Sequence, residues 1–115
     1  MNTPDNHINY VELFALDLEK IKNFYHSCFG WKFTDYGKKY TAFSDSGING
    51  GFELVDAISG SGTLIVIHHS NLKTIQKKIK ENGGKIVVET FSFPGGKRFQ
   101  FSDPSGNQLA VWTEE

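Results

Sequence analysis

The 115-residue chain is predicted to be an α+β protein made of two βαβββ modules, at about residues 7–57 and 63–113, in one domain spanning residues 1–115. The chain matches itself at a shift of 54 residues, which places Asp17 on Asn71. Both halves repeat the same order of strand-like and helix-like segments, and a chain of this length can bury one core but not two. We expect one curved, open sheet with a cleft, and the helices on its convex side.

The first module begins with a β-branched and aromatic segment, residues 8–14, which is typical of a strand. Asp17 is a suitable N-cap for a helix, whose apolar residues recur at helical spacing until Gly30 ends it. Three more strands are predicted to follow, with a loop at 47–51. They cover residues 31–36, 40–44 and 51–55.

The second module repeats this plan after the flexible segment 58–62. Residues 63–69 are predicted to form a strand and 71–82 a helix, which Gly83 and Gly84 end; Gly84 corresponds to Gly30. Three further strands are separated by turns rich in proline, glycine and asparagine. They cover residues 85–93, 98–102 and 108–113.

Composition and charge narrow the function classes. A net charge of -1, from 12 basic and 13 acidic residues, provides no basic surface for nucleic acid or for a membrane. The single cysteine, Cys28, cannot form an internal disulfide, and the first residues do not resemble a signal peptide. We therefore expect a cytoplasmic protein whose partner is a small molecule.

Three motifs follow one another along the chain: Asp17 with Phe24-Tyr25, then Phe29-Gly30-Trp31-Lys32-Phe33, and finally Asp103-Pro104-Ser105-Gly106-Asn107. Together they resemble the vicinal oxygen chelate superfamily, which includes glyoxalase I, extradiol dioxygenases and bleomycin-resistance proteins. The match runs from about His7 to Trp112. The resemblance implies paired βαβββ modules around a cleft, usually in a homodimer whose clefts can draw on both chains.

The resemblance also implies four metal-ligand positions, two in each module. The histidine position seven residues before the first helix is Tyr10 here, and its second-module counterpart is Leu64. The glutamate position seven residues after Asp103 is Ala110. Only Glu53, which corresponds to Ala110 under the repeat if three extra residues are allowed, keeps a suitable side chain.

One carboxylate is too few for a catalytic metal site. A Lewis-acid ion needs two or three protein ligands, leucine and alanine have no lone pair, and a phenol is a poor replacement for imidazole. We therefore predict no metal and no other cofactor, because the ligand positions hold Tyr10, Leu64 and Ala110.

The two-residue period of a strand predicts which other side chains line the cleft. Tyr10 and Trp112 offer flat apolar surfaces with a polar atom each, and Glu12 and Glu53 are expected to face each other across that lining. Alternatively, Glu12 pairs with a basic residue at a dimer contact. The predicted ligand-binding residues are Tyr10, Glu12, Phe14, Glu53, Val66, His68, Gln108 and Trp112.

Two functions are compatible with such a cleft. In the first, the protein binds a small, bulky and often cationic molecule without a metal, as a resistance protein does by sequestration. In the second, it is a divergent lyase or isomerase in which His68, together with Glu12 or Glu53, moves a proton. His68 could also only hydrogen-bond a ligand, or be satisfied at a strand end near the helix cap. A third hypothesis is an interaction module with a vestigial cleft.

Overall fold

The computed structural model describes residue 5 and residues 8–58 and 64–115. The predicted α+β class and the two βαβββ modules are confirmed. The predicted module starts at residues 7 and 63 and most of the flexible segment at 58–62 lie outside the described residues. Hydrogen bonding divides the strands into two four-stranded sheets, one in each module, in place of one continuous sheet.

The first sheet has the strand order β1-β4-β3-β2. β1 pairs in parallel with β4, and the other neighbours are antiparallel. The predicted loop at 47–51 is too long, because Asn49 and Gly50 already pair with Tyr10 and Val11 of β1. The elements are β1 (Tyr10–Ala15), α1 (Leu18–Phe29), β2 (Lys32–Asp35), β3 (Tyr40–Ser44) and β4 (Asn49–Leu54).

The second sheet repeats this order as β5-β8-β7-β6, again with one parallel pair, β5 and β8. β7 begins two residues earlier than predicted, because Pro94 and Gly95 suffice for a tight turn in which Gly95 has a φ of 106°. The elements are β5 (Ile65–His68), α2 (Leu72–Glu81), β6 (Lys85–Phe93), β7 (Gly96–Ser102) and β8 (Gln108–Glu114).

The two helix N-caps confirm the repeat. Asp17 and Asn71 are both extended, and each side chain accepts a hydrogen bond, at 3.0 Å, from the backbone N–H three residues later. The C-termini differ. Gly30 caps α1 in the left-handed region, whereas after α2 it is Gly83, one of the two glycines predicted to end that helix, that has this conformation. Gly84 is required for space instead, because a Cβ there would lie 2.5 Å from the Ile79 side chain.

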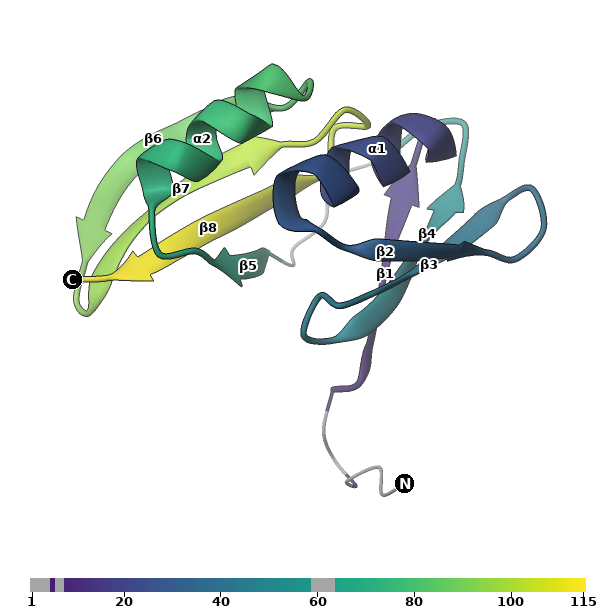
Figure 1. The fold of residues 1–115 in the computed structure, drawn as a ribbon, viewed down its shortest axis with the longest axis horizontal. Coiled ribbons are helices and arrows are strands. Elements are labelled where there is room, and N and C mark those ends of the chain that lie inside the picture. The colour runs from purple at the N-terminus through teal and green to yellow at the C-terminus, as the bar shows by residue number, and fades with distance from the viewer. Residues whose placement is uncertain (1–4, 6–7, 59–63) are drawn as a thin grey trace.

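Both helices cover one side of the molecule, and the two sheets lie on the other (Figure 1). Buried side chains from both modules form one core: the helices contact each other, and the Phe24 ring lies 6.0 Å from the Phe101 ring. Each sheet therefore has a core face against its helix and an open face directed away from it. The functional side chains must be sought on these open faces.

The turn after β7 also joins the modules. The Tyr25 hydroxyl donates to Asp103 Oδ2 at 2.9 Å, and the backbone N–H of Leu16 donates to Ser105 Oγ at 2.9 Å. Asn107 Nδ2 donates to the Phe14 carbonyl. Burial raises the pKa of Asp103, and the hydrogen bonds from Asn107, Tyr25 and Ser105 lower it only in part. The Asp-Pro-Ser-Gly-Asn motif thus fixes the second module to the end of β1.

Candidate functional site

The open face of the first sheet holds a pocket with a volume of about 440 Å³. Three tyrosine side chains line it, from β1, from β3 and from the residue after β2, and we call it the tyrosine pocket. No basic side chain is among its lining residues. They are Tyr10, Thr34, Tyr36, Tyr40, Ala42, Phe43, Ser44, Asn49 and Gly50.

A chain of hydroxyl groups runs beside this pocket. The Tyr40 hydroxyl donates to Glu12 Oε2 at 3.2 Å, and the Tyr10 and Tyr40 hydroxyl oxygens are 2.6 Å apart. Because Tyr40 has one proton and gives it to Glu12, Tyr10 donates to Tyr40. The Tyr10 oxygen is left with its acceptor lone pairs, so this network offers a ligand an acceptor and not a donor.

Gly51 makes this network possible. A Cβ at Gly51 would lie 2.1 Å from the Tyr40 hydroxyl and 2.4 Å from the ring carbon that carries it, so the tyrosine side chain occupies the space that a β4 side chain would otherwise fill. Burial, and then the hydrogen bonds with Tyr10 and Glu12, raise the pKa of the Tyr40 hydroxyl well above its usual value. Tyr40 is therefore a protonated hydrogen-bond donor near neutral pH.

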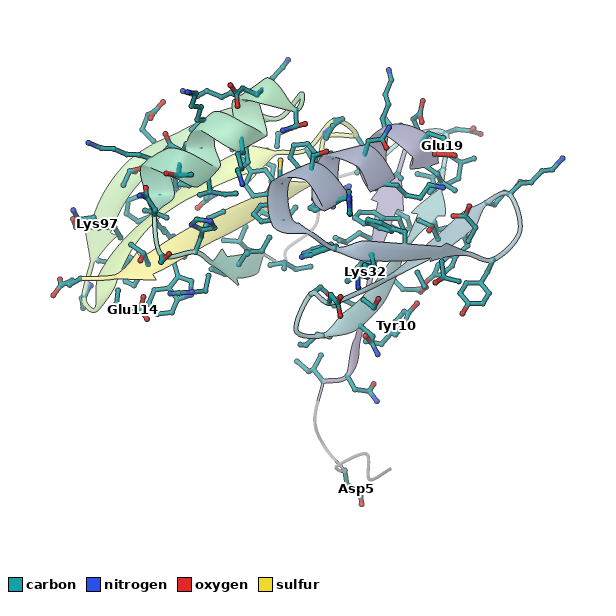
Figure 2. The ribbon with its side chains drawn as sticks, viewed as in Figure 1. Asp5, Tyr10, Glu19, Lys32, Lys97 and Glu114 are labelled. Atoms are coloured by element: carbon teal, nitrogen blue, oxygen red, sulfur yellow. The ribbon has the colours of Figure 1, made fainter. Side chains whose placement is uncertain are left out.

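The predicted cleft residues all lie on open faces, but on two different sheets. Glu12 and Glu53 do not face each other across a lining; they project from the same face of neighbouring strands, where Glu12 pairs with Gly51 and Glu53 pairs with Phe14. Figure 2 shows Tyr10 in the first module and Glu114 at the far end of the second. The first sheet carries Tyr10, Glu12, Phe14 and Glu53, and the second carries Val66, His68, Gln108 and Trp112.

The contacts of His68 differ from those expected for a proton-transfer pair with Glu12 or Glu53. Its Nε2 lies 2.6 Å from Glu114 Oε1, and its ring meets the Trp112 ring edge-on at 5.2 Å. The hydrogen bond from His68 lowers the pKa of the Glu114 carboxyl. The predicted strand-end position of His68 is confirmed, but its partner is a glutamate of β8 and not the helix cap, where His69 accepts from the Asn71 N–H.

The strand registers revise the equivalence of Glu53 and Ala110. Val66 pairs with Ala110, whereas Glu12, the counterpart of Val66 under the shift of 54, pairs with Gly51. Gly51 is therefore equivalent to Ala110, and Glu53 is equivalent to Trp112. The four positions with the geometry of the implied metal ligands are thus Tyr10, Gly51, Leu64 and Ala110.

These four residues do not fit a divalent ion. Glycine, leucine and alanine side chains have no lone pair, and the Tyr10 hydroxyl is engaged by Tyr40. Across residues 8–58 and 64–115, no three His, Cys, Asp or Glu side chains are grouped so that they could hold a metal ion. Cys28 offers no reactive group either, because burial raises the pKa of its thiol to about 11.

Sequence reasoning missed Tyr40, Arg98 and Glu114. Tyr40 was recognisable only as part of a strand, because its position over Gly51 depends on the pairing of β3 with β4. Arg98 stands beside Trp112 on the open face of the second sheet through the β7–β8 register. A two-residue period applied to β7 and β8 would have found Arg98 and Glu114, had the strands been aligned.

Comparison with known proteins gives consistent matches along the chain. The sequence model of the Glyoxalase/Bleomycin resistance protein/Dioxygenase superfamily matches residues 7–111. A glyoxylase-like domain-containing protein of Didymella fabae is 32% identical over 121 residues, which cover 92% of each chain.

No helix in the described part of the chain is long and apolar enough to cross a bilayer.

Solved structures show the same fold at low sequence identity. The fosfomycin resistance protein FosX from Listeria monocytogenes matches with a TM-score of 0.81 at 17% identity, covering 96% of this chain and 94% of that one. A glyoxalase/bleomycin resistance protein/dioxygenase family enzyme from Burkholderia phytofirmans PsJN also has a TM-score of 0.81, at 14% identity, covering 93% and 98%. These two likenesses concern the fold alone.

Proposed function

Because the chain belongs to the Glyoxalase/Bleomycin resistance protein/Dioxygenase superfamily and has lost side chains suited to the metal positions, we propose that it binds a small organic molecule without a metal. The observation that supports this most is the hydroxyl network from Tyr10 through Tyr40 to Glu12, which occupies the place of the first metal ligand. The adjoining pocket of about 440 Å³ suits a ligand of moderate size.

The chemistry of the pocket favours a protonated amine. The Tyr10 oxygen is an acceptor, Glu12 supplies negative charge, and Tyr36 and Tyr40 present aromatic surface that attracts a cation. This agrees with sequestration of cationic molecules, which requires binding alone. Proton transfer by His68 with Glu12 or Glu53 receives less support, because His68 is paired with Glu114 and Glu12 accepts from Tyr40.

Calorimetric titration with benzylammonium and with neutral benzyl alcohol tests the proposal. We expect saturable binding of benzylammonium, and a dissociation constant that rises about tenfold or more in Glu12→Gln, because a hydrogen bond to a charged group contributes roughly 1.5–3 kcal/mol. Glu81→Gln removes the same charge from the exposed end of α2 and should leave binding unchanged. Equal binding of benzyl alcohol and benzylammonium would contradict the ligand class.

The same titrations test metal independence. Added nickel, zinc or iron should leave the dissociation constant unaltered, and dialysis should show no stoichiometric uptake. Tight uptake of one ion per chain would refute the proposal. A cytoplasmic location belongs to the same proposal, because Cys28 is a free, buried thiol, as is usual in a reducing compartment.

We propose in addition that the protein is a homodimer. Both open faces expose large apolar side chains: Tyr10 and Phe14 are each 46% exposed on the first sheet, and Val66 is 45% exposed on the second. Such patches mark interaction surfaces in soluble proteins. Sedimentation equilibrium should give twice the mass of the 12.9 kDa chain, and a single species of 12.9 kDa at micromolar concentration would contradict this.

A further inference from the structure

Four side chains from the four strands of the second sheet lie in one row across its open face. Phe91 of β6 pairs with Arg98 of β7, Arg98 pairs with Trp112 of β8, and Trp112 pairs with His68 of β5. We call these residues the arginine row. Its first-module counterpart consists of Tyr40, Glu53 and Phe14, in the same register but with an acidic residue and no basic one. The two rows therefore differ in charge.

Arg98 is held in this row by packing and not by an acidic partner. Its guanidinium carbon lies 5.1 Å from the centroid of the Phe91 ring, a cation–π contact that fixes one face of the guanidinium plane. The side chain is half-buried, and its Nε is fully buried with no hydrogen-bond partner. Among the described residues, no carboxylate forms an ion pair with Arg98.

The carboxylate nearest to the row along β8 is already engaged. Glu114 Oε1 lies 2.6 Å from His68 Nε2, so this carboxylate is engaged by the histidine and not by the arginine. Next to Arg98, Trp112 offers a half-buried aromatic surface that Phe93 supports from the side, with 6.4 Å between ring centroids. A half-buried arginine without a counter-ion is costly, and the most direct compensation is an anion from outside the chain.

We propose that the arginine row binds a planar organic anion, with its carboxylate on the Arg98 guanidinium and its ring on Trp112. A guanidinium presents parallel N–H groups that match a carboxylate bidentately, and an aromatic side chain at its edge favours a flat ligand. This site goes beyond the tyrosine pocket: it lies on the other module and selects the opposite charge. It requires neither Glu12 nor the hydroxyl network.

Benzoate is the probe for this site, and titration is followed by calorimetry and by the NMR signal of the Arg98 Nε–H group. We expect saturable binding that shifts this signal, and a dissociation constant about tenfold or more higher in Arg98→Met. Arg98→Lys keeps the positive charge but loses the parallel pair of N–H donors. Its dissociation constant for benzoate should therefore lie between those of the parent protein and of Arg98→Met. Cyclohexanecarboxylate, which is not planar, should bind more weakly than benzoate.

Lys97→Met is the matched control, because it removes one positive charge from the neighbouring exposed residue, which points to the other side of β7. We expect it to leave benzoate binding within about twofold, and Arg98→Met to leave benzylammonium binding unchanged. Equal losses in Lys97→Met and Arg98→Met would show unspecific attraction and overturn the proposal. A folded Arg98→Met variant that binds benzoate normally but no longer dimerises would also overturn it, and would make Arg98 an interface residue.

Discussion

Replacing Gly50 by alanine is expected to destabilise the fold by about 3 kcal/mol or more, because the new methyl group has no space. A Cβ at Gly50 would lie 2.2 Å from the Val11 carbonyl oxygen, which belongs to the backbone of β1, and 2.4 Å from the Phe43 ring. The backbone contact can be relieved only by separating β1 from β4. Urea denaturation followed by circular dichroism would measure the loss of free energy of unfolding.

Gly51→Ala is the control at the next residue of the same strand, on the open face. The three atoms nearest to its Cβ would all be outer atoms of the Tyr40 side chain, which can rotate away. We expect the fold to persist with a loss of about 1 kcal/mol, whereas benzylammonium binding should weaken because Tyr40 leaves Tyr10 and Glu12. If Gly50→Ala were as stable as Gly51→Ala or more stable, the close approach of β4 to β1 at Gly50 would be refuted.

Asp103→Ala is the second substitution with a large expected effect, about 3 kcal/mol of destabilisation. Asp103 is 3% exposed and accepts from the buried Tyr25 hydroxyl, from the Asn107 side chain, and from the backbone N–H groups of Ser105 and Asn107. Alanine would remove the acceptor of the buried Tyr25 hydroxyl and of the Ser105 and Asn107 N–H groups, whereas the Asn107 side chain would keep the Phe14 carbonyl. Thermal and urea denaturation should show the loss, and Asp56→Ala, at an exposed carboxylate, should show little.

The pH dependence of this effect has a defined sign. Burial raises the pKa of Asp103 in the folded chain, so the folded state binds this proton more tightly than the unfolded state. The contribution of Asp103 to stability is therefore complete below its unfolded pKa of about 3.9 and decreases as the pH rises through the raised value. The difference in unfolding free energy between the parent protein and Asp103→Ala should be larger at pH 4 than at pH 7. A larger difference at pH 7 than at pH 4 would show that the hydrogen bonds lower the pKa of Asp103 by more than burial raises it.

Local signals in the sequence were sufficient to predict most of the helices and strands. The N-caps Asp17 and Asn71 and the glycine stop at Gly30 act through atoms a few residues away, so their effect could be predicted without the fold. The start of β4 could not be predicted, because the glycine-rich segment before Phe52 resembles a loop until β1 provides hydrogen-bonding partners. The role of Gly84 could not be predicted for a related reason: its constraint comes from contacts with the side chains of Ile79 and Phe24 and not from its own φ.

The sequence by itself determined the two-module plan, the family resemblance and the residues that stand at open-face positions, because these depend on spacing along one chain. Only the tertiary structure decided which of those residues meet. The registers made Gly51 and not Glu53 the counterpart of Ala110, joined Tyr10 through Tyr40 to Glu12, and set Arg98 beside Trp112. The physical reason is that strand pairing fixes neighbours across the sheet, and a shift of two residues preserves the face of a side chain while changing its partner.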